Sequence, residues 1–157
     1  MLERQQWMQR AGDYPRSDAA YFALLARAVF SAGLGPRVVE ARWSGIMSGF
    51  RGLEPEAVAQ MDAQDVSSLL ADPGVIRNRR KIEAVVANAS RFLDVVEEHG
   101  SFRRFLEELA PAHDFEAAAA RLSELFVHLG PASAALFLYS AGWRPGVVDR
   151  GGVRAAA

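Results

Sequence analysis

Residues 126–149 limit how this chain can fold more strongly than any other stretch. They contain a helix end, a tight turn at Leu129 and Gly130, and the start of a second helix at Pro131. Proline suits the first helical position because its missing N–H has no intrahelical acceptor there, and glycine permits the sharp turn. Residues 134–141 are apolar almost all round, which predicts a buried helix.

The start of that predicted helix has a property of its own. Its first backbone N–H groups have no intrahelical partners, and the positive end of the helix dipole lies there, so it can hold a phosphate. The helix is expected to stop at Gly142, and a loop then leads to Asp149. The alternative interpretation, an ordinary buried helix behind a capped turn, remains open at this point.

The rest of the chain predicts an all-α protein. Half of its 157 residues are apolar, which is enough for one compact domain over residues 1–157, with an N-terminal arm at 1–16 and a loose tail at 150–157. Strand signals are almost absent because the β-branched residues lie within helix-period patterns. The predicted helices cover residues 17–32, 36–50, 55–61, 63–70, 78–98, 101–109, 114–126 and 131–141.

Composition excludes several classes of protein. No apolar run approaches the ~20 residues of a membrane span, the first ten residues lack the apolar segment of a secretory signal, and the chain has no cysteine for disulfides or thiolate metal sites. We therefore expect a cytoplasmic, monomeric protein without a metal or other cofactor. The net charge of −1 means that any nucleic acid would have to bind a local basic patch.

One such patch is predicted at the start of the helix over residues 78–98. Arg77, Arg79, Arg80 and Lys81 are four of five consecutive residues, and their charge adds to the positive end of the helix dipole. Such a site suits a phosphate oxygen, which positions a duplex without reading its sequence. The alternative is a solvated face whose cations pair with nearby glutamates.

Two sets of residues resemble DNA repair enzymes. Gly130, Pro131, Ser133 and Ala134, followed by VVD at 147–149 and a valine at 153, resemble the hairpin of the helix-hairpin-helix DNA glycosylase superfamily, which grips the DNA backbone. The resemblance implies DNA contacts by Gly130 and Ser133. His128 lies in the same hairpin, where it either contacts a phosphate or is a surface residue without function.

A longer resemblance indicates one branch of that superfamily. Residues 75–89, VIRNRRKIEAVVANA, resemble the pattern I-I-R-N-R-x-K-I-x-A-x-x-x-N-A of the 3-methyladenine DNA glycosylase I family. SAGLG at 31–35, FRGLEPEAVAQM at 50–61 and GSF at 100–102 extend the likeness, which resumes over the hairpin to Gly142. The implied fold is a helix-hairpin-helix DNA glycosylase-like compact bundle.

The chain departs from that family in its base pocket. A glutamate that hydrogen-bonds the methylated adenine corresponds here to Ala28, and a tryptophan that stacks on the base corresponds to Pro36. The family's zinc ion, held by cysteine and histidine, has no cysteine here. The remaining candidates for stacking on an extruded base are aromatic residues, each of which could instead belong to the core: Tyr14, Phe30, Trp43 and Trp7.

Asp149 is the candidate catalytic residue. A glycosylase flips its target base out of the stack and stabilises an oxocarbenium-like sugar as the N-glycosidic bond breaks, and a carboxylate beside that sugar stabilises the developing charge and orients water. No lysine follows the hairpin, so a lyase step through a Schiff base is not expected.

Three functions therefore remain at this stage. The first is a monofunctional DNA glycosylase that excises alkylated purines such as 3-methyladenine from double-stranded DNA in base excision repair. The second is a catalytically inactive glycosylase-fold module that binds DNA or a protein partner, and the third is a helical scaffold that does not touch DNA. The first two share one requirement: the helix starts near Asn78 and Pro131 must lie on a common side.

Overall fold

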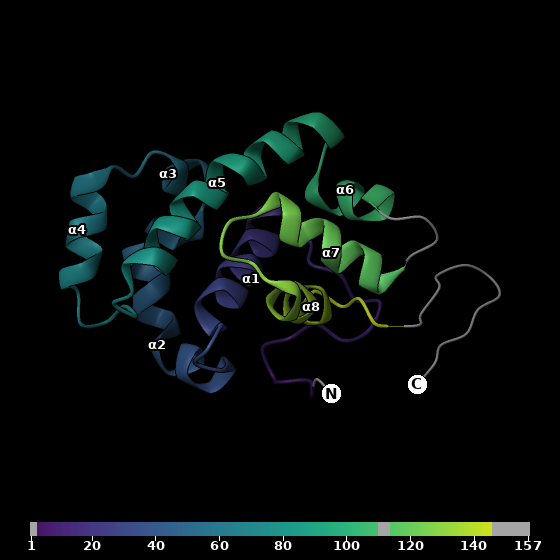
Figure 1. Cartoon of the computed structure of the whole chain (residues 1–157), viewed down its shortest axis with the longest axis horizontal. Coiled ribbons are helices and arrows are strands. Elements are labelled where there is room, and N and C mark those ends of the chain that lie inside the picture. Colours follow the sequence, from purple (N-terminus) through teal and green to yellow (C-terminus); the bar gives the residue numbers. More distant parts are fainter. Residues whose placement is uncertain (1–2, 110–113, 146–157) are drawn as a thin grey trace.

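The chain is built entirely from helices in the parts that the structure describes. The structure, a computed structural model, describes residues 3–109 and 114–145 (Figure 1), and no strand occurs among them, which confirms the all-α prediction. The helices begin and end within about two residues of the predicted limits. They are α1 (Asp18–Ser31), α2 (Pro36–Gly49), the 3-10 helix η1 (Arg51–Leu53), α3 (Pro55–Ala59), α4 (Ala63–Ala71), α5 (Arg79–His99), α6 (Phe102–Leu109), α7 (Phe115–Leu125) and α8 (Pro131–Ser140).

Side chains next to the helix ends fix several of these limits. The Ser17 hydroxyl accepts a bond from the Ala20 N–H at the start of α1, and the Asn78 side chain does the same for the Lys81 N–H at the start of α5. Such caps satisfy backbone donors that have no intrahelical acceptor. Gly100 ends α5 with a φ of 93°, a conformation that glycine adopts without strain.

The longest helix, α5, crosses the view in Figure 1 diagonally, from the side of α2 and α4 toward α6. One face of it is buried: Ile82, Val85, Ala89 and Phe92 all lie in the core. No helix within the described residues is both long and apolar enough to cross a membrane.

A cluster of aromatic side chains joins four helices in the core. The Phe102 ring of α6 stacks on Phe92 of α5 with ring centroids 4.4 Å apart, and it also lies 5.5 Å from Tyr21 of α1 and 5.9 Å from Phe137 of α8. Aromatic pairs at such separations stabilise a core beyond the burial of their area. The group fixes α1, α5, α6 and α8 relative to one another.

The turn before α5 is held tightly against α2. A Cβ atom added to Gly45 of α2 would lie 2.1 Å from the carbonyl oxygen of Gly74, so only glycine permits this approach. Arg42 of α2 donates a 3.0 Å hydrogen bond to the Pro73 carbonyl, and the Gly74 N–H donates to the Asp72 carboxylate. Through this contact α2 sets where α5 begins.

We expect Gly45→Ala to destabilise the protein although alanine is the better helix former. The added methyl group meets a backbone carbonyl that cannot rotate away, and overpacking of this kind costs about 1–3 kcal/mol, more than the ~1 kcal/mol of helix propensity gained. Urea unfolding monitored by circular dichroism measures the difference. Ser44→Ala, an exposed neighbour on the same helix, is the matched control. A Gly45→Ala variant as stable as the wild type would contradict this packing.

Candidate nucleic-acid interface

The predicted start of α8 is present and carries no cap. Gly130 occupies the N-cap position, Pro131 opens the helix, and no side chain accepts a bond from the first-turn N–H groups. Gly130, Pro131 and Ala132 are exposed, whereas the rest of the helix is buried, with Ala134 and Phe137 inaccessible to solvent. The helix therefore offers unpaired N–H groups and its positive dipole end at the surface.

The hairpin before α8 is held by one side chain of α5. The Val127 N–H donates to the Asn88 side-chain oxygen at 2.7 Å, and the Asn88 amide donates to the Val127 carbonyl at 3.0 Å. Asn88 is only 1% exposed, so this pair of bonds is shielded from water. Arg91, three residues further along α5, donates to the Leu125 carbonyl. Asn88 thus fixes the backbone of the hairpin.

Sequence reasoning missed this role of Asn88. The signal was available, because an asparagine stands in the middle of the apolar face of α5 and a buried amide has to find partners. The residue after the clamped valine, His128, is exposed and has a φ of 58°, an unusual conformation for a residue with a side chain. The two bonds from Asn88 hold the backbone immediately before it.

Lys81 differs from its neighbours in the basic cluster because it is buried. The residue is 4% exposed, and its ammonium donates to the carbonyl oxygens of Phe30, at 2.8 Å, and of Ala32. These carbonyls lie at the C-terminal end of α1, where a cation is favoured, and burial lowers the pKa of Lys81. Lys81 therefore binds the end of α1, and its contact with a DNA phosphate stays a prediction.

The other three basic residues of the cluster are exposed at the start of α5. Arg79 pairs with Glu83 one turn away at 3.3 Å, as the alternative interpretation of the cluster had it. Arg77 and Arg80 are also exposed, and neither makes an ion pair within the described residues. These two guanidinium groups are the ones available to an anion.

Spacing along α5 brings the interface together. Lys81 and Asn88 are seven residues apart, so they lie on one stripe of the helix, separated by about 10 Å along its axis. The first holds the end of α1 and the second holds the hairpin before α8. The turn after α1 and the hairpin before α8 are therefore both bound to one flank of α5.

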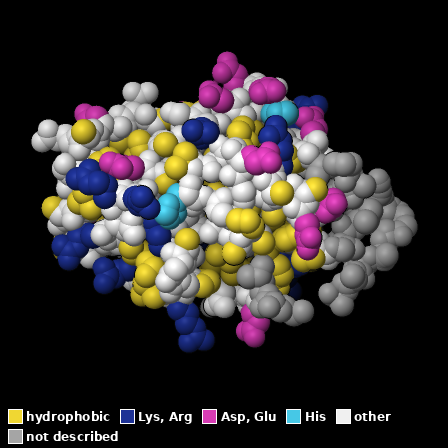
Figure 2. Space-filling model, viewed as in Figure 1, with side chains coloured by type: hydrophobic (Ala, Val, Ile, Leu, Met, Phe, Trp, Pro, Cys, Tyr) yellow, Lys and Arg dark blue, Asp and Glu magenta, His cyan; other side chains and the backbone are white. Residues whose placement is uncertain are grey.

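A third helix start lies on the same flank. α2 begins with Gly35 and Pro36, without a side-chain cap, directly after the end of α1 that Lys81 holds. Large apolar side chains are exposed beside these helix starts: Leu34 (42%), Val38 (44%) and, in the hairpin, Val127 (37%). Lys and Arg side chains gather mostly at the end of the molecule formed by α2, α4 and the start of α5 (Figure 2).

Two predicted base-binding residues belong to the core. Ala28 and Phe30 are almost fully buried, and the Phe30 ring packs edge-on against Phe50 at 5.8 Å. They face inward because α1 turns this side toward α2 and η1. Both side chains are covered in this structure, and their role in base binding stays a prediction. Pro36 is half-buried at the first position of α2.

The remaining aromatic candidates lie in two different grooves. Tyr14 lines a groove of about 600 Å³ beside α6, where its ring lies 5.0 Å from Trp143 and the Arg103 guanidinium lies 4.6 Å above it. Trp7 and Trp43 line a separate groove of about 470 Å³ between the N-terminal arm, α1 and α2. The predicted aromatic residues therefore do not form a single pocket.

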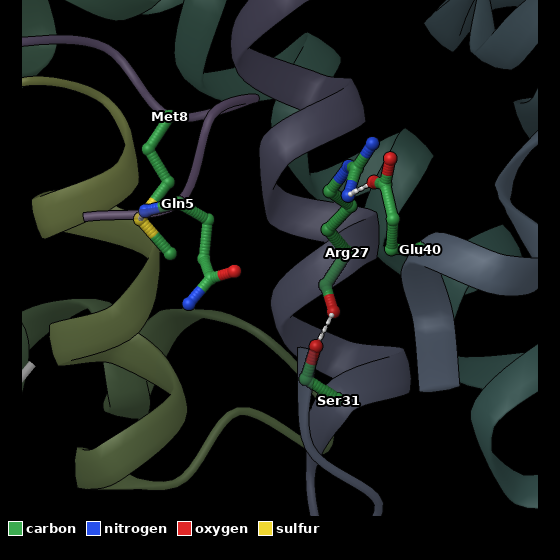
Figure 3. A network of polar contacts seen from close by, with 5 residues as sticks. All are labelled: Gln5, Met8, Arg27, Ser31 and Glu40. Atoms are coloured by element: carbon green, nitrogen blue, oxygen red, sulfur yellow. Dashed lines mark hydrogen bonds and ion pairs between the residues drawn. The ribbon is translucent and has the colours of Figure 1, made fainter. Parts of the chain in front are cut away.

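An arginine that sequence reasoning did not single out lies between the two tryptophans. The Arg27 guanidinium is 4.1 Å from the centre of the Trp7 ring and 4.2 Å from that of Trp43, and it donates to the Glu40 carboxylate at 2.8 Å (Figure 3). Burial lowers the pKa of Arg27, while Glu40 opposes that shift. Its signal in the sequence was a charged residue within the apolar run of α1.

The last candidates are a serine, an aspartate and the metal site. Ser133 is buried in the first turn of α8, with its backbone at the exposed helix start. Asp149 lies outside the described residues. Within the described residues no group of His, Cys, Asp and Glu side chains could hold a metal ion, and the chain has no cysteine, so the residues present do not fit the zinc site that the resemblance implies.

The fold matches solved structures of DNA repair enzymes. The structure of 3-methyladenine DNA glycosylase I from Staphylococcus aureus superposes with a TM-score of 0.75 at 30% identity, covering 87% of this chain and 82% of that one. A solution structure of a 3-methyladenine DNA glycosylase I matches with a TM-score of 0.68 at 25% identity, covering 83% and 80%. The architecture is thus that of a helix-hairpin-helix DNA glycosylase.

Sequence comparison defines the branch. The family model for methyladenine glycosylase matches residues 5–137, and the chain therefore belongs to the methyladenine glycosylase family. It is 31% identical over 94 residues to DNA-3-methyladenine glycosylase 1 of Escherichia coli (strain K12), over 60% of this chain and 50% of the relative. The match to the Haemophilus influenzae DNA-3-methyladenine glycosylase is 34% over 62 residues, 40% of this chain and 34% of the relative. The matched stretches span half of these relatives or less.

We expect Asn88→Ala to loosen the hairpin and to weaken DNA binding. The substitution leaves the Val127 N–H and carbonyl without their partner, which costs about 1–3 kcal/mol of unfolding free energy, and it frees the start of α8 to move. Urea unfolding and fluorescence anisotropy with a labelled duplex measure the two effects. Ser90→Ala, exposed on the same helix, is the control. Unchanged stability and affinity would show that Asn88 does not hold the hairpin.

Proposed function

We propose that this protein is a DNA glycosylase that removes alkylated purines, such as 3-methyladenine, from double-stranded DNA in base excision repair. The observation that carries the proposal is the exposed, uncapped start of α8, together with the exposed guanidinium groups of Arg77 and Arg80 at the start of α5. The names of the relatives point to the same chemistry. A monomer acting on cytoplasmic DNA fits this function.

The interface suits a DNA backbone for electrostatic reasons. Backbone N–H groups at the start of α8 and the guanidinium groups of Arg77 and Arg80 all favour phosphate oxygens. Because the net charge of the whole chain is −1, affinity has to come from this local patch. The exposed apolar side chains of Leu34 and Val38 beside it are suited to contact bases that have left the stack.

The reaction expected is hydrolysis of the N-glycosidic bond. An alkylated purine is already a cationic leaving group, so the main requirement is to stabilise the oxocarbenium-like sugar and to orient water, the role we assign to Asp149. Lys81 is the only lysine, and its ammonium is buried against backbone carbonyls. A lysine Schiff base is therefore not expected, which supports a monofunctional enzyme.

A second candidate function has one observation in its favour. The position of the family's pocket glutamate is Ala28, which lies in the core. A chain that kept the DNA-binding flank but lost base recognition would be a DNA- or protein-binding module. Base release distinguishes the two functions.

The direct test is release of purines from alkylated duplex DNA by the full chain, quantified by mass spectrometry. The wild type is expected to release an alkylated purine, and Asp149→Asn is expected to lower the rate by about a hundredfold or more, since electrostatic stabilisation of this kind supplies factors of that size. Duplex affinity should change little. If the wild type binds DNA tightly and releases no base, the binding module is the better account.

DNA binding itself should depend on the exposed arginines. We expect the Arg77→Ala, Arg80→Ala double variant to bind an undamaged duplex more weakly and to lower the slope of log affinity against log salt by about one to two, because each phosphate contact contributes roughly 0.9. The Arg104→Ala, Arg121→Ala double variant, on α6 and α7, removes the same charge elsewhere and serves as the control. Equal losses in both double variants would mean that binding is not localised to α5.

A further inference from the structure

A nearly buried arginine, Arg27, is an unusual lining residue for a groove that also contains two tryptophans. The residue is 6% exposed, and its Cζ atom lies over two indole rings, 4.1 Å from the centre of Trp7 and 4.2 Å from that of Trp43. A guanidinium carries five N–H donors in one plane, and Glu40 accepts from one terminal nitrogen. With two rings against the guanidinium, another polar group would meet it along the edge that carries its N–H donors.

The two sides of that edge meet different surroundings. Glu40 lines a neighbouring groove together with Ser44 and Met47, whereas Arg27 lines the groove of about 470 Å³ beneath the N-terminal arm. The ion pair therefore occupies the side turned toward α2. Arg27 is one of the residues that line this groove, whose size is typical of small-molecule sites.

The groove also lies next to the DNA-binding flank. Arg27 is one helical turn before Ser31, the last residue of α1, and the Ser31 hydroxyl donates to the Arg27 carbonyl at 2.7 Å (Figure 3). One turn is about 5.4 Å, and the exposed Leu34 follows directly in the turn between α1 and α2. A base extruded at that turn would have to pass along about one turn of α1 to reach the groove at Arg27.

Holding the N-terminal arm against α1 does not by itself explain why residue 27 is an arginine. An apolar side chain between two indoles would also hold the arm, without the cost of taking a charge out of water. Burial does oppose the charge on Arg27, as the lowered pKa shows. What the guanidinium adds over an apolar residue is a set of directed donors at the groove.

We propose that Arg27 is a specificity-determining residue that accepts alkylated guanines in preference to alkylated adenines, a proposal that rests on the proposed glycosylase function. Guanine carries a carbonyl oxygen at C6, and a 3-alkylguanine also keeps N7 as an acceptor, so a guanidinium edge can bind both atoms. Adenine carries an amino group at C6, which would place donor against donor. Glu40 balances the charge of Arg27, so the pair does not repel a cationic base.

Binding of free bases tests the site without requiring catalysis. Calorimetric titration of the full chain with 3-methylguanine and 3-methyladenine should show that the guanine binds about tenfold more tightly or better, as a bidentate contact allows. Arg27→Gln should remove that difference, and Arg27→Lys should restore only part of it because it lacks the fork. Arg104→Gln, an exposed arginine of α6 that is not among the residues lining this groove, is the control and should keep the preference.

Base release from methylated DNA tests the same selection during the reaction. The ratio of released 3-methylguanine to 3-methyladenine should fall about tenfold or more in Arg27→Gln and not in Arg104→Gln, with melting temperatures confirming that both variants fold. Should Arg27→Gln fail to fold, the partial loss expected of Arg27→Lys decides. Release with a ratio that Arg27 does not affect overturns this inference and leaves the glycosylase function intact. Selective guanine binding without release of any base supports the recognition site and overturns the glycosylase function.

Discussion

The structure depends on a stripe of α5 that binds other parts of the backbone through buried polar side chains. Asn88 holds the Val127 N–H and carbonyl, and Lys81 holds carbonyls at the end of α1. Leaving such groups unpaired inside a protein is costly, so each contact is made in one geometry only. A helix that fastens two chain reversals in this way fixes the orientation of the helices that follow them, α2 and α8.

Charge distribution explains how a chain of net charge −1 can present a surface to DNA. Exposed arginines occur at the start of α5 and on α2, whereas Arg103 and Arg121 of α6 and α7 pair with Glu107 and Glu124. Several basic side chains gather at one end of the visible face, where acidic side chains also lie (Figure 2). Such a local gathering of cations, and not the net charge, is what a polyanion would meet.

Sequence patterns predicted the helices well because each rests on a local signal. The apolar period of α5, the proline at the first position of α8 and the caps at Ser17 and Asn78 depend on residues within one or two turns. The buried α8 and its exposed start followed from composition and from helix geometry. These features require no knowledge of what packs against them.

The site was less predictable because its residues act across elements. Lys81 is next to exposed arginines in the sequence, yet its ammonium donates to a carbonyl at the end of α1 and its side chain is therefore buried. Arg27 is buried only because Trp7 comes from the arm and Trp43 from α2. Phe30 is aromatic, as a stacking residue would be, but its ring packs against Phe50, the residue between α2 and η1. The helical period of a sequence specifies which face of a helix is buried. The segment that packs against that face depends on the tertiary fold.

The central claim is that three helix starts on one flank of α5 contact the same DNA backbone. Hydrogen–deuterium exchange of the full chain with and without a duplex tests it most directly. The account predicts that amides in residues 33–38, 77–81 and 127–133 are protected together, while those of α6 and α7 do not change. Protection confined to one of these segments, or found on α6 and α7, would contradict it.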